Sequence, residues 1–209
     1  MTRLPAAPVL ILLAFLTAWL PAPAHAQIRG FMHAGVTGSS YRGGNLQDSS
    51  PIYRFGGGGG LRYQYPNGLE FETGLDYVVK GGELRGTLDD IPIIGVSEIT
   101  YVSLPILIGF RLQSAGRIQP RVIFGPAMSF KTDARITYRA VGGNIEQSNA
   151  DDGIQERDLG WVFGLDANTR LGSETLTAGF RLTLGNSNAR TADPEVLHTT
   201  LGFYTGIVF

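Results

Sequence analysis

The C-terminal stretch Leu197–Phe209, LHTTLGFYTGIVF, decides the fold, because its side chains alternate in character. Side chains two positions apart lie on the same face of an extended chain. One face therefore carries Leu201, Phe203, Thr205, Ile207 and Phe209, and the other carries Gly202, Tyr204, Gly206 and Val208. An alternating segment of about ten residues with one apolar face is typical of a β-strand that spans a membrane. The last strand of a soluble sheet is the alternative, and the rest of the chain decides between them.

Residues 1–26 are predicted to form a secretory signal peptide. Arg3 precedes an apolar run of 12 residues, Val9–Leu20, which is shorter than the roughly 20 residues that a spanning helix needs. Ala24 and Ala26 give the small-residue pattern of a cleavage site, so Gln27 is the expected start of the mature chain. No later apolar run is long enough for a spanning helix. The exported chain is therefore expected in the periplasm, outside the cell or in the outer membrane as a barrel.

The composition suits a protein whose outer wall contacts lipid. Charged residues make up 17% of the chain, against about 25% in typical soluble domains. The 209 residues include 29 glycines and no cysteine, so neither a disulfide nor a cysteine-linked lipid anchor can form. The formal net charge of −1 gives no reason to expect a nucleic-acid partner.

Eight alternating segments occur between residue 27 and residue 209, which we expect to form a single domain. They are Gln27–Tyr41, Ile52–Tyr65, Leu69–Gly81, Glu98–Gln113, Ile118–Lys131, Asp158–Arg170, Thr175–Gly185 and Leu197–Phe209. No helical periodicity competes with this pattern. Bacterial outer-membrane barrels have an even number of strands, and eight is the smallest usual number.

The connections between these segments alternate in length. The short ones are Pro66-Asn67-Gly68, Ser114–Arg117 and Gly172-Ser173, and the long ones are Arg42–Pro51, Gly82–Ser97, Thr132–Arg157 and Asn186–Val196. Transmembrane barrels have short periplasmic turns and longer external loops, whereas a soluble up-and-down barrel has no reason to sort its loops. The predicted fold is therefore all-β: a single eight-stranded antiparallel up-and-down transmembrane β-barrel that follows a cleaved signal peptide.

The face opposite the apolar one carries glycine, small polar and charged residues. An eight-stranded barrel has an interior just wide enough for side chains, so the large apolar side chains would overfill it and the polar face is expected inside. The charged residues on this face are Arg62, Glu70, Glu72, Asp76, Arg111, Arg121, Asp166 and Arg181. A buried charge needs a partner, and the Pro66-Asn67-Gly68 turn should place Arg62 opposite Glu72. We therefore predict an ion-pair network that plugs the lumen, with Gly56, Gly58 and Gly60 leaving room for it.

Several stretches carry a family resemblance. They are GLDYVVKGG at 74–82, YVSLPILIGF at 101–110, FGPAMS at 124–129, DLGWVFGLD at 158–166 and the terminal FYTGIVF. With them, the chain from about Gly30 to Phe209 resembles the porin-like outer-membrane β-barrel domain proteins common in Bacteroidetes-type bacteria. Where that family often has an acidic residue before the Leu-Pro pair, this chain has Ser103. The ending also resembles the C-terminal strand that the barrel-assembly machinery recognises. This resemblance implies an assembly signal at Phe203, Ile207 and Phe209.

No stretch carries the pattern of a catalytic, nucleotide or metal site. FGGGGG at 55–60 lacks the residue order of a phosphate-binding loop, and His33 and His198 stand alone without a zinc pattern. His198 has Ser187, Asp193 and Glu195 nearby, which could mimic a lipid hydrolase, but a histidine at the lipid headgroup level is favoured. Asp151-Asp152-Gly153 lacks the spaced ligands of a calcium loop, so a solvated external loop is favoured. Neither an enzyme nor a cofactor is expected.

These features predict a small monomeric barrel in the bacterial outer membrane with a packed polar lumen and a structural or surface-interaction role. Its expected partners are outer-membrane lipid and, during biogenesis, the barrel-assembly machinery; a ligand of the external loops stays open. Two alternatives remain. One is a narrow pore for small solutes or ions, and the other is a soluble exported barrel that binds an apolar ligand inside.

Overall fold

The computed structural model describes residues 27–43, 49–88, 91–112, 116–140, 145–148, 154–186 and 196–209. The predicted signal peptide and the residues Asp151–Gly153 and Ser187–Glu195 lie outside these ranges. The strands are β1 (Gln27–Arg42), β2 (Ser49–Ser50), β3 (Ile52–Gln64), β4 (Leu69–Leu88), β5 (Ile91–Arg111), β6 (Ile118–Ala140), β7 (Ile145–Ser148), β8 (Arg157–Leu171), β9 (Glu174–Gly185) and β10 (Leu197–Val208). Among the described residues, none belongs to a helix with the length and apolarity to cross a membrane.

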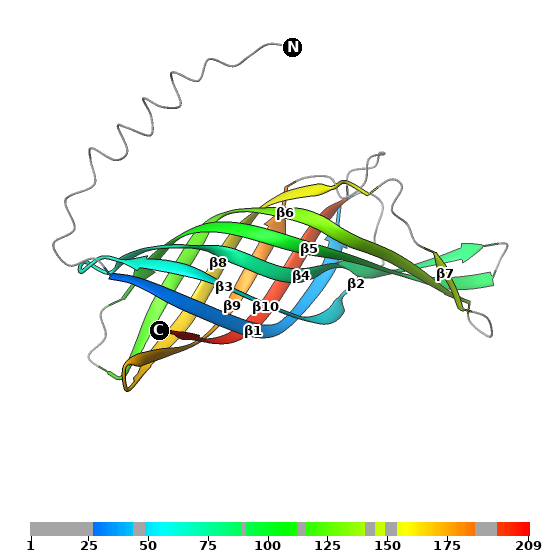
Figure 1. Ribbon diagram of the computed structural model, residues 1–209. Coiled ribbons are helices and arrows are strands. Elements are labelled where there is room, and N and C mark those ends of the chain that lie inside the picture. Colours follow the sequence, from blue (N-terminus) through cyan, green and yellow to red (C-terminus); the bar gives the residue numbers. More distant parts are fainter. Residues whose placement is uncertain are drawn as a thin grey trace, which may run out of the picture.

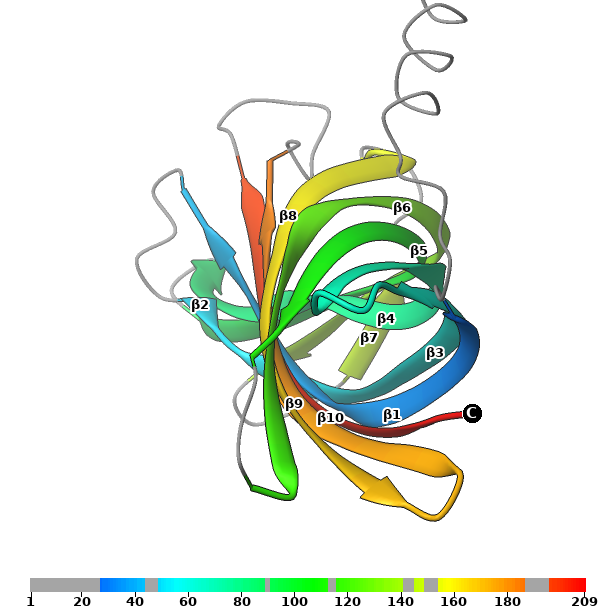
Figure 2. The same cartoon turned by 90° about the vertical axis from the view of Figure 1, so that its left-hand side faces the viewer.

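The eight long strands close into one antiparallel barrel. Strand β1 pairs with both β3 and β10, and β4 pairs with both β3 and β5, so the sheet returns to its start. Figure 2 shows the strands curving around a common interior. The short β2 and β7 only flank β4 and β6. The predicted eight-stranded barrel is therefore confirmed, and with it the strand assignment of FGGGGG in β3.

The strands are staggered around the barrel. Starting at Gln27, successive paired residues are Gln64, Glu70, Gly109, Ile123, Gly164, Arg181 and Gly202, and the path returns to β1 at Thr37. The shift is 37 − 27 = 10 residues along β1. A stagger of this kind is what tilts the strands of a closed barrel relative to its axis. It also brings side chains from strands that are not neighbours to the same level of the lumen.

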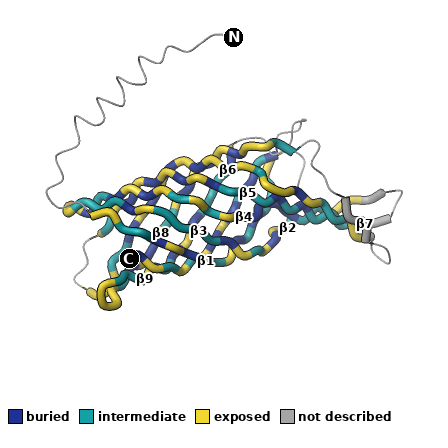
Figure 3. Tube along the Cα trace, in the orientation of Figure 1, coloured by how far each residue is buried: buried dark blue, intermediate teal, exposed yellow. Residues whose placement is uncertain are grey.

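The apolar face points outward. Phe55, Phe163 and Phe203 are 81%, 46% and 45% exposed, and Figure 3 shows buried and exposed residues alternating along the long strands. Met32 and Val36 of β1 also face outward. The alternative of a soluble barrel with an apolar ligand inside is therefore wrong, because the large apolar side chains line the outside wall.

The connection between β3 and β4 is a tight turn, as predicted. The Gly68 amide donates to the carbonyl of Tyr65 (3.2 Å), and the Tyr65 amide donates to the carbonyl of Leu69 (2.9 Å). Asn67 Oδ1 accepts from the Leu69 amide at 3.1 Å. Gly68 has a φ of 90°, which an L side chain rarely adopts. The turn fixes the register, and Arg62 pairs with Glu72 across the two strands.

The prediction of external loops at Gly82–Ser97 and Thr132–Arg157 is wrong, because much of each segment forms β-strand. Strands β4 and β5 run on to Leu88 and from Ile91, and β6 continues to Ala140 with β7 beside it. We call this projecting sheet, formed by Glu83–Leu88, Ile91–Ser97, Asp133–Ala140 and β7, the external extension; it leaves the barrel at the end away from the C-terminus (Figure 1). A strand in water has no lipid-facing side, so charged residues such as Arg85 and Arg135 replace the apolar face that the prediction relied on.

Candidate functional site: the charged lumen

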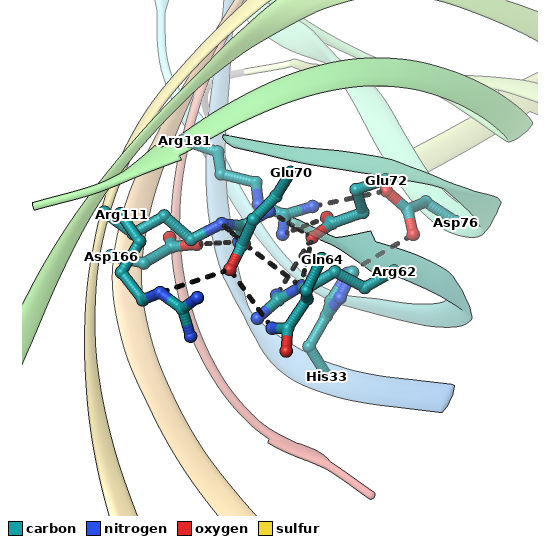
Figure 4. A network of polar contacts seen from close by, with 10 residues as sticks. His33, Arg62, Gln64, Glu70, Glu72, Asp76, Arg111, Asp166 and Arg181 are labelled. Carbon is teal, nitrogen blue, oxygen red and sulfur yellow. Dashed lines mark hydrogen bonds and ion pairs between the residues drawn. The ribbon is translucent and has the colours of Figure 1, made fainter. Parts of the chain in front are cut away.

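A network of charged and polar side chains fills the lumen toward the end with the short turns. We call it the lumen network. Its members are His33, Arg62, Gln64, Glu70, Glu72, Asp76, Arg111, Arg121, Asp166 and Arg181. Figure 4 shows that the labelled members point toward one another from different strands. The four arginines and four carboxylates carry formal charges that cancel.

Glu72 on β4 is the central acceptor. Its Oε2 contacts Arg121 Nη2 at 2.5 Å and Arg62 Nη2 at 2.9 Å, and its Oε1 accepts from Arg181 Nη2 at 2.9 Å. Glu72 is 1% exposed. Three guanidinium groups thus surround one carboxylate that is cut off from water, which satisfies its acceptor positions with charge-assisted hydrogen bonds.

Arg121 on β6 is the central donor, and it has no exposed surface. Besides Glu72, its Nε contacts Glu70 Oε2 at 2.7 Å and its Nη1 contacts Asp166 Oδ2 at 2.7 Å. The planar guanidinium with five N–H donors is suited to several carboxylates at once. Arg121 thus holds together β4, β6 and β8, which contribute these three acids and the arginine itself.

The structure brings together all eight charged residues that the sequence proposed, but not equally. Arg111 lies at the margin, 3.8 Å from Glu70, with 27% of its side chain exposed. Asp76 lies at the opposite margin, 3.9 Å from Arg181 and 3.3 Å from His33 Nε2. The sequence did not predict His33 in this group, because the segment Gln27–Tyr41 has no clean alternation.

The glycine-rich part of β3 makes room for this margin of the network. Gly58 pairs with Asp76. A Cβ atom on Gly58 would collide with the Asp76 carboxylate and with the backbone carbonyl of Leu75. A larger residue at this position would therefore push Asp76 out of reach of Arg181.

An apolar layer that the sequence pattern did not predict lies beside the network. Leu107, Ile123, Ala127 and Val162 face the lumen and are all less than 7% exposed. They fall on the face of each strand that otherwise carries glycine and polar residues. The signal was present, since Ile123 lies between the inward Arg121 and Gly125, but single apolar residues on a polar face do not show how they cluster.

A second ion pair closes the lumen nearer the external end. Lys80 Nζ contacts Asp158 Oδ2 and Ser129 Oγ at 2.7 and 3.0 Å, and Ser129 donates to Ser103 at 3.1 Å. Lys80 and Asp158 are 3% and 2% exposed. We call Lys80 and Asp158 the upper pair. Between it and the lumen network lies a cavity of about 40 Å³ whose lining includes Arg181 and Tyr204, which is room for ordered water.

His198 is buried under the external end, which corrects the expectation of a histidine at the lipid headgroup level. It is 1% exposed, and its ring lies 5.0 Å from that of Tyr41 and 6.2 Å from that of Tyr101. Within the described ranges neither ring nitrogen has a hydrogen-bond partner. His198 pairs with Tyr41 of β1. Paired residues on neighbouring strands share a face of the sheet, and here that face is the lumen side. Among the described residues, no group of three or more His, Asp or Glu side chains is arranged to hold a metal ion.

The barrel thus has an apolar outer wall and a lumen closed by charged side chains, as expected of a membrane barrel. Residues 27–189 match the family described as the outer membrane protein beta-barrel domain. The chain belongs to this family. It is an outer-membrane β-barrel protein, and the family resemblance of the sequence is thereby confirmed. At the level of the family, these barrels are not enzymes.

Solved structures that match the chain share little of its sequence. The Neisserial surface protein A has 13% sequence identity and a TM-score of 0.49, over 86% of this chain and 97% of that one. Ail, the attachment invasion locus protein of Yersinia pestis, solved with the heparin analogue sucrose octasulfate, has 11% identity and a TM-score of 0.41, over 88% and 99%. The N-terminal β-barrel domain of OprF from Pseudomonas aeruginosa has 14% identity and a TM-score of 0.35, over 88% and 100%. In sequence, no individually curated protein matches the chain.

Proposed function

We propose that the protein is a monomeric structural or surface-interaction barrel whose lumen does not conduct solutes. The observation that carries this proposal is that Glu72 on β4 binds both Arg121 on β6 and Arg181 on β9, because β4 and β9 lie on opposite sides of the eight-stranded barrel. The lumen-facing Leu107 and Ile123 have no exposed surface. The upper pair then adds a second closure nearer the external end.

Opening a water-filled path would require several of these ion pairs to separate together. Breaking one buried pair by removing a partner costs about 3–5 kcal/mol in typical proteins. Arg121 alone contacts Glu70, Glu72 and Asp166, so a side-chain movement that frees it loses three contacts at once. This coupling supports a closed ground state over a narrow pore.

The external extension supports a surface role. Its exposed side chains include the charged Arg85, Asp133, Arg135 and Arg139. Arg85 lies 3.2 Å from Glu83, and Glu98 on the adjoining part of β5 forms an ion pair with Arg54. Charged residues of both signs on a projecting sheet suit contact with polar partners outside the cell. They also keep the exposed strand edges from pairing with other chains.

We further propose that cleavage after Ala26 releases a chain beginning at Gln27. Strand β1 begins at Gln27, and so does the family match, which supports a boundary there. We also propose that Phe203, Ile207 and Phe209 form the assembly signal. All three side chains are on the outer face, 45%, 36% and 54% exposed, where an assembly factor can reach them.

Single-channel recording in planar bilayers tests the closed lumen. The barrel purified from outer membranes should give no reproducible conductance step. Glu72→Gln, which weakens the ion pairs to three arginines, should produce open events, whereas Arg85→Gln on the external extension should behave like the wild type. A reproducible open step with the wild-type protein would instead support the narrow pore.

A further inference from the structure

The end of the barrel with the short turns contains a cavity of about 250 Å³ that the closed lumen leaves unused. In transmembrane barrels this end faces the periplasm. Arg62 and Glu70 form its floor, and both are at most 2% exposed. Arg29, Arg111 and Arg170 stand around its rim. We call this cavity the arginine cup.

The arginine cup has an excess of positive charge. Its lining contains four arginines and one carboxylate, Glu70. That carboxylate is already engaged, since its Oε2 lies 2.7 Å from Arg121 Nε inside the lumen network. Of the rim arginines in the described residues, Glu70 contacts Arg111, at 3.8 Å, and it forms no ion pair with Arg29 or Arg170.

Two rim arginines have no acidic partner within the described part of the chain. Arg29 donates to neutral oxygens only, the carbonyls of Ser173 (2.9 Å) and Val208 (3.3 Å) and the hydroxyl of Thr175 (3.4 Å). Arg170 is exposed and forms no ion pair with the described residues. Guanidinium groups bind carboxylates and phosphates through paired N–H donors, and this capacity is unused at both residues.

A buried amide provides an independent indication of a ligand. Asn168 lines the arginine cup and is 4% exposed, yet its Oδ1 has no hydrogen-bond partner among the described residues. Buried polar atoms are nearly always satisfied. The oxygen and nitrogen of an amide can exchange places by rotation of the group, which would turn the NH₂ donors of Asn168 toward an anion in the cup.

We propose that the arginine cup binds a small oxyanion that carries phosphoryl or carboxylate groups and enters from the periplasmic side. The volume lies just below the roughly 300–1,000 Å³ of sites for drug-sized molecules, which suits a small anion rather than a polymer. This site goes beyond the structural role proposed above, because it requires the barrel only as a scaffold.

Isothermal titration of the purified barrel with inorganic phosphate and pyrophosphate, in a nonionic detergent, tests the site. The wild-type protein should bind pyrophosphate more tightly than phosphate, and added salt should weaken both. The double variant Arg29→Gln/Arg170→Gln should lose about tenfold or more in affinity, because it removes two charge-assisted donors. These side chains make no ion pair in the lumen network, so the variant should still fold, which an SDS gel with and without boiling checks.

Arg85→Gln on the external extension is the matched control, since it removes one of the same charges at the other end of the barrel. It should bind both anions like the wild type. No binding by the wild-type protein at millimolar anion, or an equal loss in Arg85→Gln, would overturn the proposal. Repeating the titration in nanodiscs with and without phosphatidylglycerol identifies the source: competition by that lipid means that a headgroup supplies the phosphoryl group, and unchanged affinity means that the anion is soluble.

Discussion

Arg121 on β6 and Glu72 on β4 meet at 2.5 Å in the lumen, although β5 separates their strands in the sheet. The contact therefore reaches across the curved interior rather than along a ladder of neighbouring strands. Each residue also binds two further partners of opposite charge. Substitution of either one should affect the whole lumen network.

Arg121→Ala should lower the free energy of unfolding by about 3–5 kcal/mol, because it leaves Glu70, Glu72 and Asp166 buried with fewer partners. Urea titration of the barrel in lipid vesicles measures this change. Arg85→Ala, on the exposed surface, should stay within about 0.5 kcal/mol of the wild type. A decrease of less than about 1 kcal/mol for Arg121→Ala would show that the lumen carboxylates become hydrated or protonated when the arginine is removed.

The upper pair allows the coupling between two buried charges to be measured in isolation, since Lys80 and Asp158 form an ion pair that does not include the lumen network. Lys80→Met alone should lower the free energy of unfolding by about 3–5 kcal/mol, because it leaves the buried carboxylate of Asp158 without its cationic partner. The double variant Lys80→Met/Asp158→Leu should be less destabilised than the sum of the single changes, by about 0.5–3 kcal/mol. Simple additivity in the same urea titration would mean that the two charges are not coupled.

Phe163→Arg should reduce folding into lipid vesicles, because Phe163 is 46% exposed on the outer wall in the middle of β8. A charged residue facing the bilayer centre costs about 2–4 kcal/mol. Tyr138→Arg, on the external extension, is the control and should fold with nearly wild-type yield. If both variants insert equally well, the membrane does not surround β8 at this level.

Phe209→Ala should reduce the amount of barrel in the outer membrane of cells more than the yield of refolding in detergent. The backbone of Phe209 bonds that of Gly30 through its amide (2.9 Å) and its carbonyl (3.0 Å), and the substitution keeps these bonds while removing the exposed ring. Fractionation of cells and a gel of refolded protein compare the two yields. Equal losses would assign the ring a purely structural role and refute the assembly signal.

Intact-mass measurement of the barrel from outer membranes should give the mass of residues 27–209. Ala26→Leu should block the cut after residue 26, because signal cleavage requires small residues at that site. Ala22→Leu is the matched control: it makes the same change outside the pattern formed by Ala24 and Ala26, so the mass of the mature chain should stay the same. A longer mature chain in the wild type would move the boundary.

The sequence predicted those parts of the fold that depend on a period of two. That period assigns Phe163 and Phe203 to the lipid side and Arg62 and Glu72 to the lumen, because side chains two positions apart share a face. A three-residue turn was enough to align Arg62 with Glu72. These relations involve neighbouring strands only, and local pattern determines them.

The contact between Arg121 and Glu72 could not be predicted in the same way. It depends on the ten-residue stagger, which arises only when the last strand pairs with the first. The external extension was not predicted for another reason. Its outer face contacts water, so Arg85 and Arg135 can occupy positions where lipid would require the apolar residues on which the strand prediction relied. His198 was misplaced because its burial depends on Tyr41 and Tyr101, which come from other strands.

The pairing of Phe31 with Val208 has a consequence for the order of events during synthesis. These residues are 208 − 31 = 177 positions apart, so the ring cannot close until β10 has left the ribosome. Every shorter nascent chain would expose two edge strands with unpaired backbone N–H and C=O groups. Non-local pairing of this kind is slow, and the chain must therefore be kept from premature association until it reaches the membrane.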